Sequence, residues 1–246
     1  MKRNFFPDLK VRVRVPELMD DPGLPVREHV RALAGLRRIN ALSRSDAILW
    51  PPLRDLARRS NRPLRVLDVA TGAGDVPLRL AARFRKAGLP VELSGCDLSP
   101  VAVAAARAAG LNAFEHDVLA APLPTGYDAV TSSLFLHHLD PPEAKVLLAH
   151  MAAAGNLVLV NDLRRCRTGW WAAWVGTRLL TRSPVVHYDG PVSVAGAFTP
   201  DEAVRLAEEA GLAGATAANR WPWRFLLSWA RPVGIMPLSQ GPRVDA

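Results

Sequence analysis

The pattern of hydrophobic positions is helical in the first part of the chain. Apolar side chains recur three or four residues apart between residues 24 and 60, a spacing that predicts helices. The adjacent Pro51 and Pro52 are expected to break this stretch into at least two helices, because proline lacks the N–H that a helix interior needs. Residues 10–15 alternate basic and apolar side chains, which is typical of a strand. We therefore predict an N-terminal arm and helical cap over residues 1–62.

Residues 63–232 alternate short apolar runs with amphipathic segments, the pattern of a parallel sheet connected by helices. Strands are predicted at residues 64–69, 91–96, 113–116, 127–132, 157–160, 215–218 and 225–230, and helices at residues 75–86, 100–109, 141–153 and 199–210. A capping box of Thr199 and Glu202 opens the last helix. The fold class is therefore predicted as α/β, a Rossmann-like doubly wound, mostly parallel seven-stranded sheet. The insertion at 166–198, after the fifth strand, is predicted to form a lid, and the tail at 233–246 is expected to be loose.

Composition is typical of an intracellular globular protein. The 246 residues are enough to bury a core without covalent cross-links. With two cysteines, Cys96 and Cys166, a disulfide scaffold is excluded and a reducing compartment is expected. No apolar run reaches the roughly 18–20 residues that span a bilayer, and the N-terminus lacks the apolar segment of a signal peptide. We therefore expect a cytoplasmic protein without a membrane span.

Positive charge is concentrated toward the N-terminus. The formal net charge is +8, and residues 1–64 hold 14 basic and 7 acidic side chains. Such a region could attract a nucleic acid, an acidic membrane surface or an anionic substrate. However, only 4 of the 31 basic residues are lysines, and the abundance of Arg, Ala, Pro and Gly equally fits a general compositional bias. Since no RNA-binding module is recognisable, we expect no nucleic-acid partner.

The sequence VLDVATGAGD, which begins at Val66, predicts a ligand-binding turn. A buried strand ends near Asp68, and Gly72 and Gly74 let the backbone of the following turn approach a ligand closely. A dinucleotide site is the nearest alternative, but a pyrophosphate prefers bare N–H groups without a neighbouring carboxylate. The acid at the strand end instead suits a ligand that carries an ammonium group.

Three further segments place polar residues at predicted strand ends: CDLSP from residue 96, HDV from residue 116 and YDAVTSSLFLHHL from residue 127. With VLDVATGAGD, they resemble the class I S-adenosylmethionine-dependent methyltransferases, close to the ubiquinone/menaquinone methyltransferases, over roughly residues 62–232. The resemblance implies S-adenosylmethionine as the cofactor, with Asp97 accepting hydrogen bonds from both ribose hydroxyls and Asp117 holding the adenine amino group. The cofactor contacts that it implies are Asp68, Ala70, Thr71, Gly72, Gly74, Asp97, Leu98, Asp117, Val118, Ser133 and Leu134. Ala70 stands where the family usually has its first glycine.

The end of the fourth strand narrows the methyl acceptor. Family members that methylate adenine amino groups or glutamine amides carry [D/N/S]-P-P-[Y/F] there, whereas this chain has Ser132-Ser133-Leu134-Phe135. The resemblance therefore implies an oxygen or carbon acceptor on a small molecule. We predict O-methylation of a small aromatic or polyketide-type hydroxyl, as in natural-product pathways. The alternatives are C-methylation of a quinone-like ring, methylation of RNA, and a non-catalytic protein that binds S-adenosylmethionine.

For a hydroxyl acceptor, the candidate base is a histidine, which can accept a proton near neutral pH. His138 is preferred because it follows the fourth strand, with His187 and Asp162 as alternative catalytic residues, while His137 is expected to be structural. Acceptor contacts are predicted at Asn161, Arg164, Trp171, Trp174, Tyr188 and Asp189. Residues 187–189 are expected in a loop that closes on the substrate, although three polar residues there could also simply form a turn. No metal site is predicted, and a homodimer is left open.

Three tryptophans in the insertion, Trp170, Trp171 and Trp174, are spaced to place two of them on one helical face. A helix of about a dozen residues is too short to span a bilayer. It could pack in the core, cover the acceptor as a lid, or lie in a lipid interface. We favour the lid.

Overall fold

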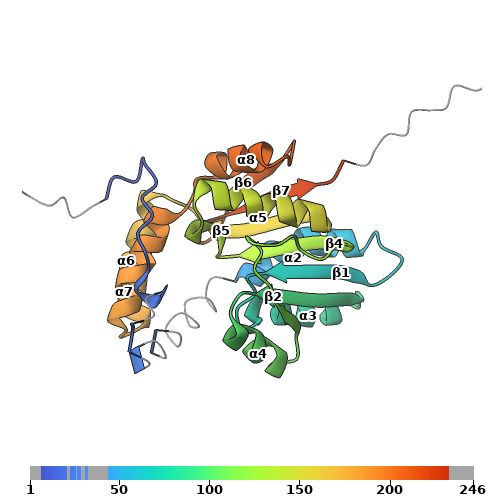
Figure 1. The fold of residues 1–246 in the computed structure, drawn as a ribbon, viewed down its shortest axis with the longest axis horizontal. Coiled ribbons are helices and arrows are strands. Elements are labelled where there is room, and N and C mark those ends of the chain that lie inside the picture. Colours follow the sequence, from blue (N-terminus) through green and yellow to red (C-terminus); the bar gives the residue numbers. More distant parts are fainter. Residues whose placement is uncertain (1–6, 21–22, 26, 29–30, 33–43, 233–246) are drawn as a thin grey trace, which may run out of the picture.

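The computed structural model describes residues 7–20, 23–25, 27–28, 31–32 and 44–232. Its centre is a seven-stranded sheet in the order β3-β2-β1-β4-β5-β7-β6 (Figure 1). The strands are β1 (Leu64–Val69), β2 (Val91–Asp97), β3 (Asn112–Glu115), β4 (Tyr127–Ser133), β5 (Gly155–Leu163), β6 (Thr216–Arg220) and β7 (Arg224–Ala230). The strands from β1 to β5 pair in parallel, whereas β7 is antiparallel to both β5 and β6. The predicted mostly parallel sheet is confirmed.

Helices pack on both faces of this sheet, as a doubly wound fold requires (Figure 1). One face is covered by α2 (Ser45–Ala57), α3 (Asp75–Lys86) and α4 (Pro100–Ala108), and the other by α5 (Pro141–Ala154) and α8 (Pro200–Glu209). In β1, Leu64 and Val66 pack on the α2–α3 side, while Leu67 and Val69 pack on the α5–α8 side. Burial on both faces explains why β1 is apolar along most of its length.

The strand order reverses between β1 and β4. On one side β1 is followed by β2 and β3, and on the other side by β4 and β5. In open parallel sheets, such a switch point leaves a crevice beyond the carboxyl ends of the two strands, where ligands bind. Because Val69 pairs with Ser132 in register, the glycine-bearing turn after β1 lies next to the segment that follows β4.

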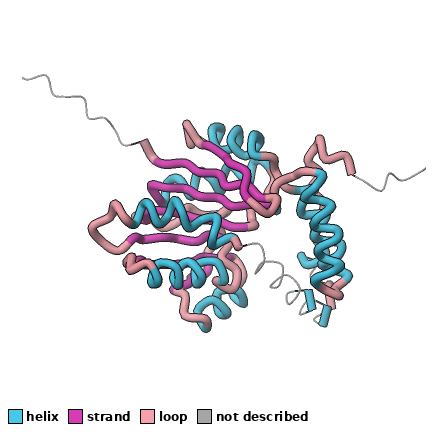
Figure 2. The backbone as a smooth tube through the Cα atoms, turned by 180° about the vertical axis from the view of Figure 1, so that it is seen from behind, coloured by secondary structure: helices cyan, strands magenta, loops and turns pink. Residues whose placement is uncertain are grey.

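Two more helices, α6 (Arg167–Leu180) and α7 (Pro184–Gly196), pack against each other beside the carboxyl edge of the sheet. Residues 7–20 of the N-terminal arm run along this pair, which stands apart from the strands in both views (Figures 1 and 2). The short turns η1 (Leu18–Asp20) and η2 (Leu136–His138) contact α7. Among the described helices, none has both the length and the apolar character to cross a membrane.

Arg12 fixes the arm to the rest of the molecule. Its Nε donates a hydrogen bond of 2.6 Å to the carbonyl of Gly196, and its Nη2 donates to the carbonyls of His137 and Leu139 at 3.0 and 2.7 Å. Hydrogen bonds from a charged donor contribute about 1.5–3 kcal/mol each. One side chain thus joins the arm, the end of α7 and η2.

The strand predicted at residues 10–15 is wrong. The N–H of Val13 donates to the carbonyl of Ala195 at 3.3 Å, so the segment bonds to the end of α7 instead of a strand. The alternation of basic and apolar residues has a different cause. It turns Arg12 toward backbone carbonyls, while Val13 and Val15 line an apolar groove against α6 and α7.

The predicted break at Pro51 and Pro52 is also wrong, because both prolines lie inside α2. A proline in a helix interior costs roughly 3 kcal/mol through its missing N–H and the clash of its ring. Burial of Ile48, Leu49 and Leu53, which are 7%, 0% and 0% exposed, offsets this cost. The apolar positions expected between residues 33 and 43, and the tail at 233–246, lie outside the described residues.

Two predicted loops are regular structure. Residues 187–189 belong to α7, which continues through Pro191, so the loop expected there is wrong. β5 extends to Leu163, so Asn161 and Asp162 end a strand instead of following it. Antiparallel pairing with β7 explains the longer strand, because Asp162 is opposite Phe225 in the ladder. By contrast, the capping box of Thr199 and Glu202 is formed as predicted.

Candidate active site

Strained backbone marks the switch point. Ala70, after β1, and Leu134, after β4, both have positive φ, at 54° and 59°. Such a conformation costs a non-glycine residue roughly 1–3 kcal/mol and persists only where surrounding contacts impose it. Here the N–H of Thr71 donates to the backbone carbonyl of Cys96 at 3.0 Å, and the N–H of Leu134 donates to the backbone carbonyl of Asn161 at 2.9 Å. Neighbouring strands therefore hold both turns in place.

Asp68 organises the turn after β1 from below. Its Oδ2 accepts a hydrogen bond from the hydroxyl of Thr71 at 2.9 Å, and its Oδ1 accepts one from Thr131 at 2.6 Å. Burial raises the pKa of Asp68 to about 6, although the two hydroxyl hydrogen bonds oppose the shift. Asp68 therefore favours a positively charged ligand at this turn, because a nearby positive charge would stabilise the ionised carboxylate.

Asp97 at the end of β2 shapes the same turn. Its Oδ2 accepts from the N–H of Gly72 at 2.8 Å, and its Oδ1 accepts from Ser99 at 2.9 Å. A carboxylate oxygen can accept more than one hydrogen bond, so Asp97 keeps capacity for ligand hydroxyls. Gly72 has φ of +56°, and a Cβ there would meet nothing within 4 Å, so the space above this turn is open.

Gly95, inside β2, was not singled out from the sequence. A Cβ at this position would lie 2.8 Å from the side chain of Thr71, so only glycine lets the turn pack against β2. No turn signal surrounds Gly95, and its role follows from a neighbour 24 positions earlier in the chain.

The third predicted carboxylate has a mainly local role. Asp117, which follows β3, accepts hydrogen bonds through Oδ1 from the N–H groups of Leu119 and Ala120, at 2.9 and 3.2 Å. Val118 beside it is buried, whereas Leu98, after β2, is 64% exposed. Asp117 thus fixes a turn at the carboxyl edge of the sheet, in line with Asp68 and Asp97.

A second polar cluster lies at the ends of β4 and β5, where His137 and Asp162 form a buried pair. The Nδ1 of His137 lies 2.6 Å from Oδ1 of Asp162, and the backbone N–H of His137 donates to Oδ2 at 3.2 Å. Because a carboxylate only accepts, Nδ1 carries the hydrogen and Nε2 is the nitrogen that points away. Burial alone would lower the pKa of His137, but the charge and hydrogen bond of Asp162 raise it overall.

His138 differs from its neighbour. Burial, together with the positive charge of a protonated His137, lowers the pKa of His138 to about 3. The two rings are in contact, with centroids 4.1 Å apart. His138 is therefore neutral near pH 7 and is a weak proton acceptor. Asp162, another predicted catalytic residue, is hydrogen-bonded to His137.

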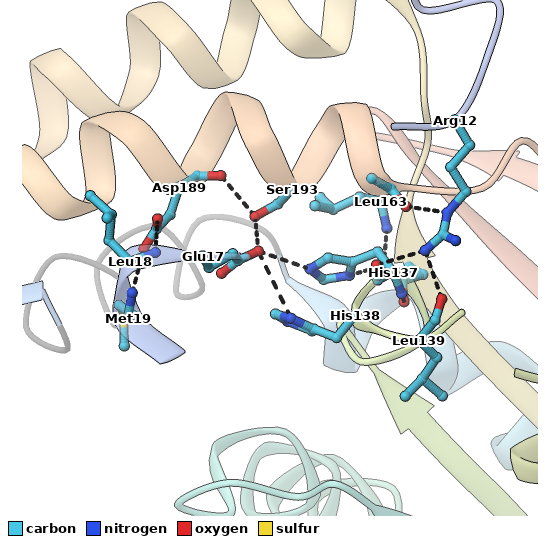
Figure 3. Close-up of polar contacts among 12 residues, drawn as sticks. Arg12, Glu17, Leu18, Met19, His137, His138, Leu139, Leu163, Asp189 and Ser193 are labelled. Atoms are coloured by element: carbon cyan, nitrogen blue, oxygen red, sulfur yellow. Dashed lines mark hydrogen bonds and ion pairs between the residues drawn. The ribbon is translucent and has the colours of Figure 1, made fainter. Parts of the chain in front are cut away.

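Glu17 of the arm completes this cluster and was missed from the sequence. Its Oε1 lies 3.9 Å from Nε2 of His137 and 3.9 Å from Nδ1 of His138, and it accepts a hydrogen bond from the hydroxyl of Ser193 (Figure 3). The three ligand-type atoms of Glu17, His137 and His138 lie within 4.8 Å of one another, so this group could also hold a cation. Glu17 lies 120 residues from His137 and follows no motif, so the sequence contains no signal for it.

Buried polar atoms without hydrogen-bond partners adjoin both clusters. Ser133 Oγ and both side-chain amide atoms of Asn161 have none among the described residues, and Ser133 pairs with Asn161 in register. Such atoms typically cost about 1–3 kcal/mol each. Arg224, also missed from the sequence, is buried opposite Leu163, and burial lowers its pKa to about 10 while Asp162 raises it.

Of the remaining predicted residues, the catalytic candidate His187 and the acceptor contacts Tyr188 and Trp174 are not brought to this cluster, whereas the carbonyl of Asp189 adjoins it by accepting a hydrogen bond from the hydroxyl of Ser193 at 2.9 Å. His187, Tyr188 and Trp174 line the apolar groove, which has a volume of about 500 Å³, on the opposite side of α7 from Ser193. Asp189 accepts from the N–H groups of Leu18 and Met19 at 2.7 and 3.2 Å, and it thereby fixes η1.

Arg164 and Trp171 also lie away from the polar cluster. The backbone N–H of Arg164 donates to the carbonyl of Trp223 at 2.9 Å. The side-chain Nε of Arg164 is buried without a hydrogen-bond partner in the part of the chain that is described. Trp171 is 42% exposed on α6. An acceptor-binding role for these two residues stays a prediction.

Comparison with known proteins finds methyltransferases that are similar to part of this chain. The family described as "Methyltransferase domain" matches residues 66–155. A 3-hydroxy-5-methyl-1-naphthoate 3-O-methyltransferase from Streptomyces sahachiroi is 34% identical over 105 residues, which are 40% of this chain and 30% of that protein. A demethylmenaquinone methyltransferase from Thermus thermophilus is 39% identical over 108 residues, which are 41% of this chain and 47% of that protein.

A solved structure shares the fold over most of the chain. The S-adenosylmethionine-dependent methyltransferase SibL, in its apo form, superposes with a TM-score of 0.62 at 21% identity, covering 91% of this chain and 65% of that one. The chain spans less than half the length of both curated relatives. The resemblance predicted from the strand ends is confirmed.

Proposed function

We propose that this chain, a class I S-adenosylmethionine-dependent methyltransferase by its domain match and its fold, transfers a methyl group to a hydroxyl of a small aromatic acceptor. The observation that carries the proposal is the buried His137–Asp162 pair beside the switch point. A hydroxyl loses its proton during methyl transfer, and a histidine oriented by a carboxylate is a suitable proton acceptor.

The residues at the carboxyl edge fit the predicted cofactor, which the family match also supports. Asp97 would accept hydrogen bonds from the ribose hydroxyls, and Asp68 would balance the positive charge of the amino acid end. The open space above Gly72 allows the close approach of the backbone that this site needs. When bound, S-adenosylmethionine supplies the methyl group together with its own leaving group. The protein's task is then to hold the acceptor in line and to remove its proton.

We assign the proton acceptor to His137 in place of the predicted His138. In this assignment Nε2 of His137 would take the hydroxyl proton of the acceptor as the acceptor oxygen receives the methyl group that bound S-adenosylmethionine would supply. Asp162 holds the Nδ1–H and stabilises the imidazolium that forms. A raised pKa makes His137 the stronger base of the two histidines, since base strength follows the pKa of the conjugate acid.

The names of the relatives support a naphthoate-like or a quinone-like acceptor. The Streptomyces sahachiroi protein is named a naphthoate 3-O-methyltransferase, and the Thermus thermophilus protein is named a demethylmenaquinone methyltransferase. The His137–Asp162 pair could deprotonate a ring hydroxyl in either case, so C-methylation of a quinone-like ring remains the second candidate. The natural-product pathway, the cytoplasmic location and the absence of a nucleic-acid partner stay predictions.

The test is a methyl-transfer screen with labelled S-adenosylmethionine against hydroxynaphthoates, hydroxyquinones and RNA. Product mass together with acid demethylation distinguishes an O-methyl from a C-methyl product. We expect turnover on a hydroxylated aromatic compound. Labelled RNA would instead establish the RNA alternative, and cofactor binding without any turnover would favour a non-catalytic protein.

Variants then test the proton acceptor. His137→Ala and Asp162→Asn should lower turnover by roughly 10²–10⁴ and leave the affinity for S-adenosylmethionine within a few-fold. His187→Ala should retain turnover, because this side chain lies on the groove side of α7 and contacts the carbonyl of Thr181 at 2.8 Å. Wild-type turnover in His137→Ala, with a loss in His138→Ala, would return the role to His138.

A further inference from the structure

The outward side of α6 and the turn between β6 and β7 form an exposed apolar surface with basic residues at its edges. We propose that this surface, called here the α6 face, binds the surface of a lipid bilayer that contains anionic lipids. The face consists of Arg167, Trp171, Val175, Arg178, Leu179, Arg182, Arg220, Trp221 and Trp223. The proposal is independent of the acceptor and of the residues assigned to catalysis.

Helix α6 is amphipathic with an apolar stripe on its exposed side. Trp171, Val175 and Leu179 are spaced four residues apart, which places them on one side of the helix. Their side chains are 42%, 40% and 80% exposed. The opposite side of the helix, with Trp170 and Thr177, is buried. The stripe is therefore additional to the apolar side that fixes α6 to the molecule.

The turn between β6 and β7 extends this stripe. Trp221 is 78% exposed and Trp223 is 40% exposed. The indole Nε1 of Trp223 donates to the hydroxyl of Thr168 at 3.1 Å, so the turn lies against the first residues of α6. Tryptophan is enriched where proteins meet the boundary between lipid headgroups and acyl chains, because its ring is apolar and its N–H is polar.

The charges of the α6 face match an anionic partner. Arg167, Arg178, Arg182 and Arg220 are exposed, and residues 164–196 and 216–224 contain one acidic residue, Asp189. Asp189 is only 3% exposed and accepts hydrogen bonds from the backbone of η1, so it does not reach this surface. Apolar anchors surrounded by arginines are the composition of helices that lie in the interface of anionic membranes.

The apolar groove adjoins the same surface. Trp174 and Tyr188 line it together with Val13 and Val15 of the arm, and Trp171 is in edge contact with Trp174 at 5.7 Å between ring centroids. Because Glu17 and Ser193 lie on the other side of α7, a protein docked through the α6 face keeps the His137–Asp162 pair directed away from the lipid.

A second copy of the chain fits this face less well than lipid. In a two-fold dimer the same patch meets itself, so four exposed arginines would face four others without an acidic partner on the patch. Like charges across an interface are strongly unfavourable. The other large apolar residues with substantial exposure in the described ranges lie elsewhere. They are Leu98 and Val101 near α4, Val146 on α5, Val11, Val13, Val15 and Leu18 in the arm, Leu180 at the end of α6, and Tyr188 in the groove.

The experiment is flotation of the full-length protein with vesicles of phosphatidylcholine alone and of phosphatidylcholine with phosphatidylglycerol. The wild type should float with the anionic vesicles and much less with the neutral ones. Arg167→Gln with Arg182→Gln should weaken binding about 25-fold, since each basic residue near an anionic surface contributes about fivefold. Val175→Ser with Leu179→Ser should weaken binding to the anionic vesicles at least fivefold by removing apolar anchors.

Val146→Ser is the matched control, because Val146 has a similar exposure to Val175, 38% against 40%, but lies on α5. It should bind vesicles as the wild type does. Circular dichroism and titration with S-adenosylmethionine verify that each variant is folded. Equal flotation of the wild type and both double variants would overturn the proposal. The proposal would also be overturned if the wild type did not bind vesicles but formed a dimer, and if Val175→Ser with Leu179→Ser abolished that dimer. The α6 face would then join two copies of the chain.

Discussion

The carboxyl edge of β1 and β2 and the cluster of Glu17, His137 and Asp162 lie at the same end of the sheet but are built differently. At the edge, Asp68, the turn and Asp97 lie within 30 residues, and their hydrogen bonds follow from the ends of two adjacent strands. The cluster combines the arm, η2 and β5, which are separated by up to 145 residues. The first region recurs wherever the strand–turn–helix unit recurs, whereas the second depends on how distant segments pack.

This difference predicts that the two regions can be disabled separately. The largest effect on the affinity for S-adenosylmethionine is expected from Asp97→Ala, which removes the proposed acceptor of both ribose hydroxyls and the hydrogen bond from Gly72. Hydrogen bonds to a charged group contribute about 1.5–3 kcal/mol each, so the affinity for S-adenosylmethionine should fall at least tenfold in titration calorimetry. Glu92→Ala removes an exposed acid from the other end of β2 and should bind normally. Unchanged affinity in Asp97→Ala would contradict the ribose assignment.

The pH dependence of cofactor binding should follow Asp68, whose pKa is raised by burial to about 6. The carboxylate, and not the neutral acid, attracts a positively charged ligand, so affinity should fall as the pH drops through about 6. Between pH 7 and pH 5 the expected loss is up to about tenfold, the change in the ionised fraction. Calorimetry over this range measures it, and Asp68→Asn should bind weakly without this pH dependence. If the affinity of the wild type did not depend on pH, Asp68 would not be the group that interacts with the positive charge of the ligand.

A smaller effect is expected from loosening the arm. Arg12→Ala removes three hydrogen bonds to backbone carbonyls and should let Glu17 move away from His137, so turnover should fall about fivefold, the equivalent of about one hydrogen bond. Affinity for S-adenosylmethionine should stay within twofold, because the hydrogen bonds of Arg12 go to Gly196, His137 and Leu139 and not to the β1 turn. Arg14→Ala is the control, since its ion pair with Asp140 is exposed and worth little. A loss of cofactor affinity in Arg12→Ala would mean that the two regions are coupled.

The smallest expected effect is that of chelation. If His137 accepts the proton directly, treatment with EDTA should leave turnover within about twofold, since a proton acceptor of this kind needs no metal. Glu17, His137 and His138 are nevertheless close enough to share a cation. A loss of turnover that a single divalent cation restores would identify the cluster as a metal site and would replace the proton-transfer assignment.

The fold could be predicted almost completely, because the hydrophobic period of each strand and helix is local. β1 and α3 lie at the predicted residues, and the other elements of the core differ mainly in their ends. The failures have tertiary causes. Pro51 and Pro52 stay helical because α2 buries four apolar side chains, and residues 10–15 hydrogen-bond to the end of α7. Asn161 and Asp162 join β5 because β7 pairs with them.

The candidate site divides in the same way. Local sequence was enough to place the turn around Gly72 and the acids Asp68, Asp97 and Asp117, because a glycine or an acid at a strand end has one position relative to a parallel sheet. The pairing of Asp162 with His137, and not with His138, depends on tertiary packing, because η2 turns one ring toward β5. Tertiary packing also brings Glu17 to the cluster, because Arg12 holds the arm through hydrogen bonds to backbone carbonyls. Every residue has a backbone carbonyl, so the sequence gives no sign of these contacts.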